Sequence, residues 1–144
     1  MPTQPTYRAW RFVHPDLDVP DTGTGVQLDL RGGVAMIEGP AAVRQAIFLL
    51  LSTRPGERVM RPEYGCELYR VVFMNNDDTT AGLAIHWVRV AILRWEPRIE
   101  ILSLDAIRNP ESAELLDVTL EYRVKLTLQG NQLRFSVPLT GGTI

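Results

Sequence analysis

Apolar and polar residues alternate without interruption over residues 116–128. The apolar set comprises Leu116, Val118, Leu120, Tyr122, Val124, Leu126 and Leu128. A period of two is typical of a strand with one buried face and one solvated face. Gly130 and Asn131 favour a tight turn. The sequence therefore predicts a strand over residues 116–128 and a reversal of the chain directly after it.

A second alternating segment follows the predicted turn. Its apolar face comprises Leu133, Phe135, Val137 and Leu139. Pro138 has no backbone N–H to donate, so it places this strand at a sheet edge or ends its pairing there. The two segments thus predict a C-terminal hairpin with an edge that can accept a further strand from a partner.

Two other segments have the spacing of helices. Within residues 40–52 apolar residues recur at i, i+3 and i+4, and Pro40 suits the first helical position because its missing N–H would be unpaired there. A second helix is predicted over residues 79–95, where apolar residues lie on nearly every side. Pro97 disfavours helical geometry at Glu96 and ends this helix.

Short apolar runs at residues 34–38 and 99–107 complete the predicted strands. The order strand, helix, loop, helix and three strands is typical of an α+β fold. We expect residues 34–144 to form one domain, in which the two main helices pack on one face of a small antiparallel sheet. Residues 1–33 are interrupted by prolines and glycines and predict an extended N-terminal arm, which lies against its own domain or a partner.

Composition excludes several classes of function. A formal net charge of −2 over 144 residues provides no field that would attract nucleic acid. The longest apolar run, residues 46–51, is too short to span a bilayer, and the N-terminus lacks the apolar region of a secretory signal. Cys66 is accompanied only by His14 and His86, so no metal or cofactor site is predicted. We interpret Cys66 as a small buried residue.

Residues 54–68, RPGERVMRPEYGCEL, combine six charged residues with a Pro-Gly turn. Three glutamates are candidates for acid and base catalysis: Glu57, Glu63 and Glu67. Three arginines are candidates for a docking surface: Arg54, Arg58 and Arg61. Carboxylates at this density are common in soluble domains, and the chain has no catalytic triad, phosphate-binding loop or dinucleotide motif. The pattern therefore favours a rigid connector after the first helix, with no catalytic residue, and its charges either face a neighbouring protein or hold the loop to its own domain.

Two motifs together resemble one family. Residues 39–68 are GPAAVRQAIFLLLSTRPGERVMRPEYGCEL and residues 95–101 are WEPRIEI. Their order and spacing are similar to those of the small baseplate wedge proteins of contractile phage tails, type VI secretion systems and extracellular contractile injection particles. The resemblance covers residues 34–139. Its loop motif consists of Arg54, Pro55, Gly56, Glu57, Arg58, Arg61, Pro62, Tyr64, Gly65 and Cys66.

The resemblance implies a structural role in assembly. Glu96, Pro97 and Arg98 correspond to a motif that docks on the wedge core, although an internal Glu96–Arg98 pair that fixes the corner between helix and strand explains them equally well. Residues 116–139 correspond to a hairpin that initiates the sheath. The sheath-facing edge strand is then the one that carries Leu133, Phe135 and Val137.

The resemblance also implies partners and a location. The expected partners are larger baseplate wedge proteins and sheath subunits, with inner tube or hub proteins as further candidates, and six copies are expected per baseplate. The protein would be in the bacterial cytoplasm during assembly and then part of a phage tail or extracellular particle. Because the family has also been labelled a tail lysozyme, a peptidoglycan-degrading enzyme is the alternative.

Overall fold

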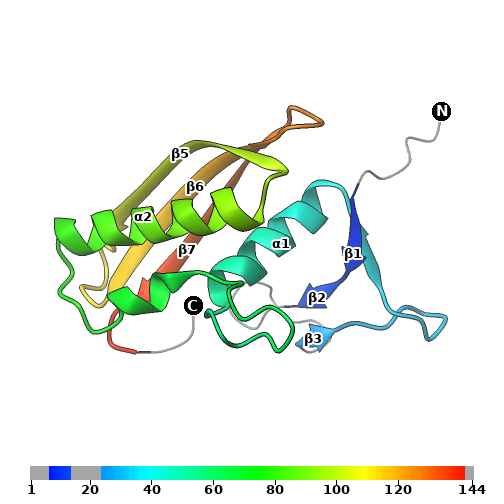
Figure 1. Ribbon diagram of the computed structural model, residues 1–144, viewed down its shortest axis with the longest axis horizontal. Helices are drawn as coiled ribbons and strands as arrows, with labels where there is room; N and C mark the ends of the chain where they lie inside the picture. Colours follow the sequence, from blue (N-terminus) through cyan, green and yellow to red (C-terminus); the bar gives the residue numbers. More distant parts are fainter. Residues whose placement is uncertain (1–6, 14–23, 142–144) are drawn as a thin grey trace. The chain divides into compact units, whose positions relative to one another are not determined.

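The computed structural model describes residues 7–13 and 24–141 (Figure 1). The chain divides into two compact units, Met1–Ala46 and Ile47–Ile144. His14 lies outside the described residues. The predicted boundary between an arm, residues 1–33, and a domain, residues 34–144, stays a prediction. No helix in the described part of the chain has the length and apolar character needed to cross a membrane.

The first unit contains two small antiparallel strand pairs. β1 (Arg8–Trp10) pairs with β4 (Met36–Glu38), and β2 (Phe12–Val13) pairs with β3 (Gly25–Val26). The side-chain amide of Gln45 joins the segment between β1 and β2 to a helix. It donates to the Trp10 carbonyl and accepts from the Phe12 N–H, each over 2.8 Å. Residues 8–13 of the predicted arm therefore lie against their own chain.

The two predicted helices are present. α1 is Pro40–Ser52, as predicted, and α2 is Asp78–Trp95, one residue longer than predicted. Asp77 caps α2 by accepting from the Thr80 N–H over 2.9 Å. Apolar residues lie on nearly every side of α2, but not all of them are buried, because Val90 and Leu93 are exposed.

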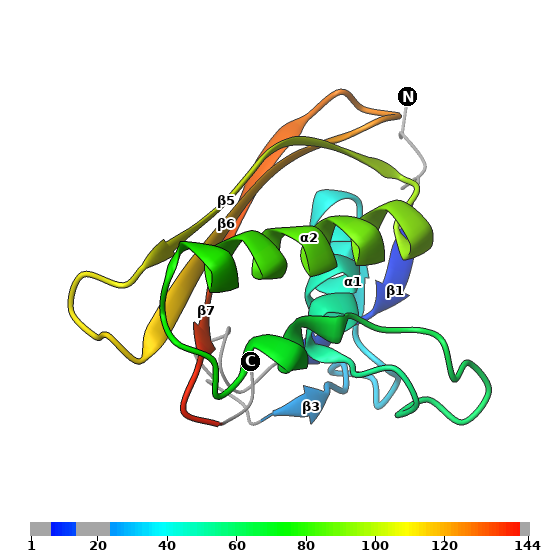
Figure 2. The ribbon, with the colours of Figure 1, turned by 60° about the vertical axis from the view of Figure 1, so that its left-hand side comes forward.

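The second unit is built around a three-stranded antiparallel sheet. Its strands are β5 (Ile99–Arg108), β6 (Leu115–Val124) and β7 (Gly130–Pro138), in the order β5-β6-β7. α2 packs against β5 and crosses one face of the sheet, and a short 3-10 helix, η1 (Glu67–Val71), precedes it (Figure 2). Two helices with small antiparallel sheets confirm the predicted α+β fold.

The position of the hairpin turn differs from the prediction. β6 ends at Val124, and the chain reverses through residues 125–129, so Gly130 already pairs with Arg123 at the start of β7. The Leu128 N–H donates to the Val124 carbonyl over 2.8 Å, and Leu128 has a positive φ of 56°. Leu126 and Leu128 are exposed. The alternation continued through the turn because apolar residues occupy loop positions that contribute nothing to the core.

Candidate functional site

The arginine loop, residues 53–66, connects α1 to η1 and is closed by its own backbone. The Gly56 N–H donates to the Pro62 carbonyl over 2.7 Å, and the Cys66 N–H donates to the Thr53 carbonyl over 2.9 Å. Pro55 and Gly56 form the predicted turn, in which Gly56 has a φ of +96°. These bonds hold the loop in one shape.

The base of the loop requires a glycine and a small buried residue. A Cβ atom on Gly65 would lie 2.5 Å from the Thr53 carbonyl oxygen, and the φ of Gly65 is +139°. Cys66 is 2% exposed, which confirms the prediction of a small buried residue, and its Sγ lies 3.5 Å from the Trp87 carbonyl oxygen. Burial raises the pKa of its thiol to about 11.

Aromatic and arginine side chains attach the loop to the last turn of α2. The Arg58 guanidinium lies 4.4 Å from the centre of the Tyr64 ring, which in turn meets Trp95 edge to face at 5.3 Å. Arg94 stacks on Trp95 and forms an ion pair with Glu63. Burial raises the pKa of the Tyr64 hydroxyl, and the nearby Glu96 carboxylate acts in the same direction.

The Glu-Pro-Arg motif forms the corner directly after α2. Glu96 is only 5% exposed, and its two carboxylate oxygens accept from Arg98 Nε and Nη2 over 2.5 and 2.7 Å. This two-bond arrangement makes Arg98 the charge partner of a buried carboxylate. The carbonyl of Arg98 also accepts from the Lys125 N–H over 2.9 Å, next to the start of β5. The internal pair is therefore present, and a docking role for the motif stays a prediction.

The structure brings the two sequence motifs together. Tyr64 of the loop contacts Trp95, the residue before the Glu-Pro-Arg corner, and lies within electrostatic range of Glu96 and Arg98. We name the arginine loop together with residues 95–98 the loop–corner surface. Sequence spacing did not show this contact, because about thirty residues and a whole helix separate the motifs. The tryptophan in WEPR was the one signal that could have indicated it.

The three glutamates once considered for catalysis each have a partner. Glu57 Oε2 accepts from the Arg54 N–H over 3.1 Å, Glu63 pairs with Arg94, and Glu67 pairs with Arg70. The pocket lined by Glu63 and Glu67 holds about 60 Å³. Pockets that bind small molecules usually hold several hundred Å³. In the described part of the chain, Glu57 bonds within the loop, Glu63 joins the loop to α2 and Glu67 pairs within η1, and the pocket that Glu63 and Glu67 line is small.

The β7 edge is a second candidate site. The Leu139 N–H donates to the Glu114 carbonyl, and the Val124 N–H donates to the Gln129 carbonyl. In an antiparallel ladder, every second residue of a strand bonds to the neighbouring strand, and the residues between them direct their N–H and C=O groups away from it. Counting in steps of two from residues 139 and 129, the predicted edge residues of β7 direct their backbone groups toward β6. Those edge residues are Leu133, Phe135 and Val137, and their side chains are buried. The outward backbone groups belong instead to Gln132, Arg134 and Ser136.

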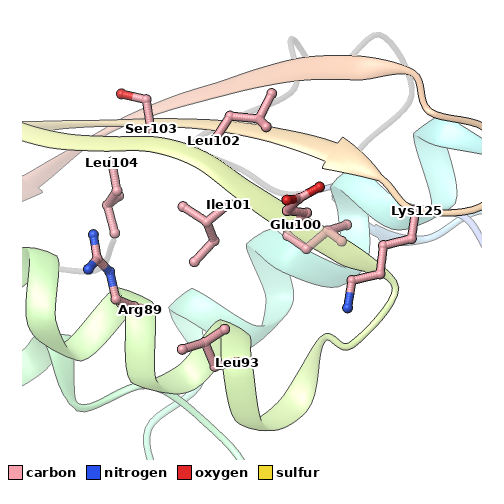
Figure 3. A pocket seen from close by; sticks show the side chains of 9 residues that line it. Arg89, Leu93, Glu100, Ile101, Leu102, Ser103, Leu104 and Lys125 are labelled. Atoms are coloured by element: carbon pink, nitrogen blue, oxygen red, sulfur yellow. The ribbon is translucent and has the colours of Figure 1, made fainter.

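The β5 edge differs in its local structure. Its pairing with β6 shifts register between Ile101 and Ser103, which marks a β-bulge. The outward N–H of Ala106 donates to Asp105 Oδ1 over 2.9 Å. Beside this edge, a groove of about 380 Å³ separates β5 from α2, with Arg89 and Leu93 on the helix side (Figure 3).

Comparison with known proteins decides the family. Residues 38–129 match the family described as baseplate wedge protein gp25. The chain belongs to this family. The prediction of a small baseplate wedge protein is thereby confirmed.

Individual members of the gp25 family and structural neighbours agree with this assignment. The gp25 protein of Enterobacteria phage T4 is 28% identical over 87 residues, which are 60% of this chain and 66% of that protein. The chain therefore spans slightly less than two thirds of the T4 protein. A candidate tail lysozyme from Geobacter sulfurreducens is 37% identical, has a TM-score of 0.65 and is matched over 73% of this chain and 96% of that one.

Two baseplate assemblies contain chains of the same fold. One is the anti-feeding prophage baseplate, with 21% identity, a TM-score of 0.62, and coverage of 92% of this chain and 86% of that chain. The other is the baseplate complex of the type VI secretion system, with 18% identity, a TM-score of 0.56, and coverage of 69% and 92%. At these identities the likeness shows the fold alone.

Proposed function

We propose that this protein is a structural component of the baseplate of a phage tail or contractile injection machine, where it joins the wedge to the first sheath subunits without catalysing a reaction. Its membership of the gp25 family supports the location. The observation that carries the connecting role is the edge strand β7, which pairs with β6 on one side only among the described strands.

Strand addition at β7 fits the geometry of its backbone. The outward groups of Gln132, Arg134 and Ser136 recur every second residue, as a further antiparallel or parallel strand requires. The side chains of Leu133, Phe135 and Val137 anchor the strand in the core, so the edge is ordered before a partner arrives. The partner we assign to this edge is an extended segment of a sheath subunit.

Docking on the wedge is assigned to the corner formed by Glu96, Pro97 and Arg98. The carboxylate of Glu96 orients Arg98 through two hydrogen bonds, and Pro97 is exposed beside it. An arginine held in one rotamer loses little entropy when it binds a carboxylate or carbonyl of a partner. Glu96 thus acts as the positioning residue, and Pro97 and Arg98 face the larger wedge proteins.

Assembly in the bacterial cytoplasm, followed by incorporation into the particle, completes the proposal. Six copies per baseplate are consistent with the six-fold symmetry of the anti-feeding prophage baseplate, which contains a chain of the same fold. Inner tube or hub proteins are the further candidate partners.

A tail lysozyme is the second candidate, favoured by the name of the Geobacter relative. Under this alternative, purified protein clears a peptidoglycan suspension, and changing Glu57, Glu63 or Glu67 to Gln abolishes the clearing. The partners of these three carboxylates argue against it, since a general acid needs a proton to donate and a substrate within reach. We expect no clearing by the unmodified protein.

The connecting role is tested by Arg134→Pro, with Arg134→Ala as the matched control. Proline at this position removes an outward N–H and places its ring where an added strand would lie, while the ladder to β6 is kept. In cells that lack the native copy, we expect Arg134→Ala to support sheathed particles and Arg134→Pro to yield baseplates and tubes without sheath. Sheaths of normal length with Arg134→Pro would contradict strand addition at β7.

The docking role has its own test. Replacing Glu96 and Arg98 together by Ala removes both charges, so neither is left buried without its partner. We expect a folded protein that is absent from purified baseplates, with folding verified by circular dichroism and urea unfolding. Normal incorporation of the double variant would restrict these two residues to a structural role.

A further inference from the structure

The tip of the arginine loop displays two adjacent apolar side chains. Val59 is 95% exposed and Met60 is 91% exposed. Single exposed apolar residues are common on protein surfaces, but this neighbouring pair at the end of a loop has no contact with the described residues that explains it. Neither side chain contributes to the fold, so neither is needed there for stability.

The tip has a fixed conformation. The Arg61 N–H donates to the Arg58 carbonyl over 3.2 Å, which makes residues 58–61 a turn with Val59 and Met60 at its two central positions. The Gly56–Pro62 bond closes the loop behind this turn. Arg58 is held over the ring of Tyr64, which packs on α2. The entropy of ordering the turn is therefore already lost before binding, which favours a rigid contact.

The charge around the tip is positive. Arg58 and Arg61 flank the apolar pair, whereas the two acidic residues of the loop have other partners: Glu57 Oε2 accepts from the Arg54 N–H, and Glu63 pairs with Arg94 of α2. A complementary surface would combine an apolar pocket for two aliphatic side chains with carboxylates at its rim. A lipid surface is bound instead by the apolar face of an amphipathic helix or by a cluster of several basic residues, and this turn forms neither.

We propose that the turn at residues 58–61 is a plug, which inserts Val59 and Met60 into an apolar pocket with a carboxylate rim on a neighbouring baseplate protein. This proposal rests on the proposed function. It adds a contact that involves neither the β7 edge nor the Glu-Pro-Arg corner. The rest of the loop–corner surface holds the turn in one position.

A photo-crosslinking amino acid at position 60 identifies the pocket. Assembled particles that contain the substituted full-length chain are irradiated, and the crosslinked peptide is sequenced by mass spectrometry. We expect one main adduct, in a baseplate subunit, on a segment that contains apolar residues and aspartate or glutamate. Adducts spread over many proteins, or none above the level of unirradiated particles, would overturn the proposal.

Paired variants separate the apolar contact from general surface effects. Val59→Ser with Met60→Ser removes the plug, and Val59→Ile with Met60→Leu retains it. Because both side chains are exposed, all of these variants should unfold at the same urea concentration as the unmodified protein. We expect the serine variant to be reduced about tenfold or more in purified baseplates, and the aliphatic variant to be incorporated normally. Equal incorporation of both would overturn the plug.

Two controls separate the possible failures. If the unmodified protein is not incorporated into particles, the proposed function fails. If it is incorporated and the serine variant is incorporated equally well, only the plug fails. Flotation with vesicles of phosphatidylglycerol and phosphatidylcholine tests a membrane surface instead. Vesicle binding that depends on Val59 and Met60 would overturn the proposal in favour of lipid, and we expect none.

Discussion

The two edge strands of the three-stranded sheet, β5 and β7, both present backbone groups that no other described strand pairs, but they differ in local structure. Both edge strands have backbone groups that point away from β6. On β7, the outward groups run in register over Gln132, Arg134 and Ser136, up to the proline that ends the strand. On β5, a bulge interrupts the register, and Asp105 occupies the N–H of Ala106. Under the proposed function, β7 is thus the edge that accepts a partner strand, and β5 is the edge that does not.

This difference between β5 and β7 makes the two edges of the sheet unequal as sites for a further strand. If both edges accepted strands equally, copies of the domain could pair with one another in place of a partner. On β5, the bulge and the hydrogen bond from the Ala106 N–H to Asp105 are both local features. They make this edge less suited to a further strand without covering it by another element. Specific assembly at β7 would therefore depend as much on the structure of β5 as on that of β7.

The largest expected effect comes from proline at Val137, whose N–H faces β6. Val137→Pro removes a ladder hydrogen bond inside the sheet and should cost roughly 3 kcal/mol or more of unfolding free energy. Arg134→Pro, at an outward position, should cost about 1 kcal/mol. Urea unfolding followed by circular dichroism measures both. Equal losses would mean that the assignment of inward and outward residues on β7 is incorrect.

Next in size is the corner where β5 begins. Arg98→Ala leaves the carboxylate of Glu96, which is 5% exposed, without its two hydrogen bonds from Arg98. We expect a loss of about 2 kcal/mol, below the usual range for a buried pair because Arg98 is partly exposed. Changing Glu96 and Arg98 together to Gln should cost less than Arg98→Ala alone. Urea unfolding measures the free energy of unfolding of both variants. A larger loss in the double variant than in Arg98→Ala would contradict the stabilising pair of Glu96 and Arg98.

A smaller effect should open the closed edge. Asp105→Ala removes the acceptor of the Ala106 N–H and should cost about 1 kcal/mol. The freed N–H should also increase self-association, measured by sedimentation velocity at several concentrations. Asp105→Asn is the matched control, because it removes the charge and retains an acceptor oxygen. If both variants associated equally, loss of charge would explain the result and the capped N–H would not.

The smallest effect is a local response to acid at the start of α2, the helix that packs against β5. The hydrogen bond from the Thr80 N–H lowers the pKa of the Asp77 carboxyl below its ordinary value of 3.8. The cap therefore stabilises α2 fully above that value, and its contribution is lost as the pH falls through the lower pKa of the folded state. Hydrogen exchange should show lost protection at Thr80 on acidification, while Val137 in β7 stays protected. Asp77→Asn, which caps without titrating, should abolish this pH dependence.

Much of the fold was predictable because its periodicities are local. The residues of α1 carry a complete apolar stripe between a proline start and a Pro-Gly turn, and the prediction was correct at both ends. The hairpin turn was not predictable in the same way. Leu126 and Leu128 continue the alternation although neither is buried, and only the register between β6 and β7 places the reversal at residues 125–129.

The candidate sites were predictable as motifs but not as surfaces. Arginine, proline and glycine in the loop indicated a rigid segment, whereas its contact with α2 depends on packing between Tyr64 and Trp95. The edge strand was also predicted, but its outward residues were not. Apolar alternation identifies the side chains that enter the core, whereas the direction of the backbone groups depends on which pairs of the ladder are hydrogen-bonded.

The single cysteine has a practical consequence for labelling. Cys66 is 2% exposed, and a thiol with a pKa of about 11 remains almost entirely protonated near neutral pH, so reagents that attack thiolates should not modify it in the folded protein. A second cysteine placed at Arg134 or Met60 would then accept a fluorophore selectively, without replacement of the native residue. Opening of the loop base would expose Cys66 itself. The rate at which a thiol reagent modifies Cys66 therefore measures how often the loop base opens.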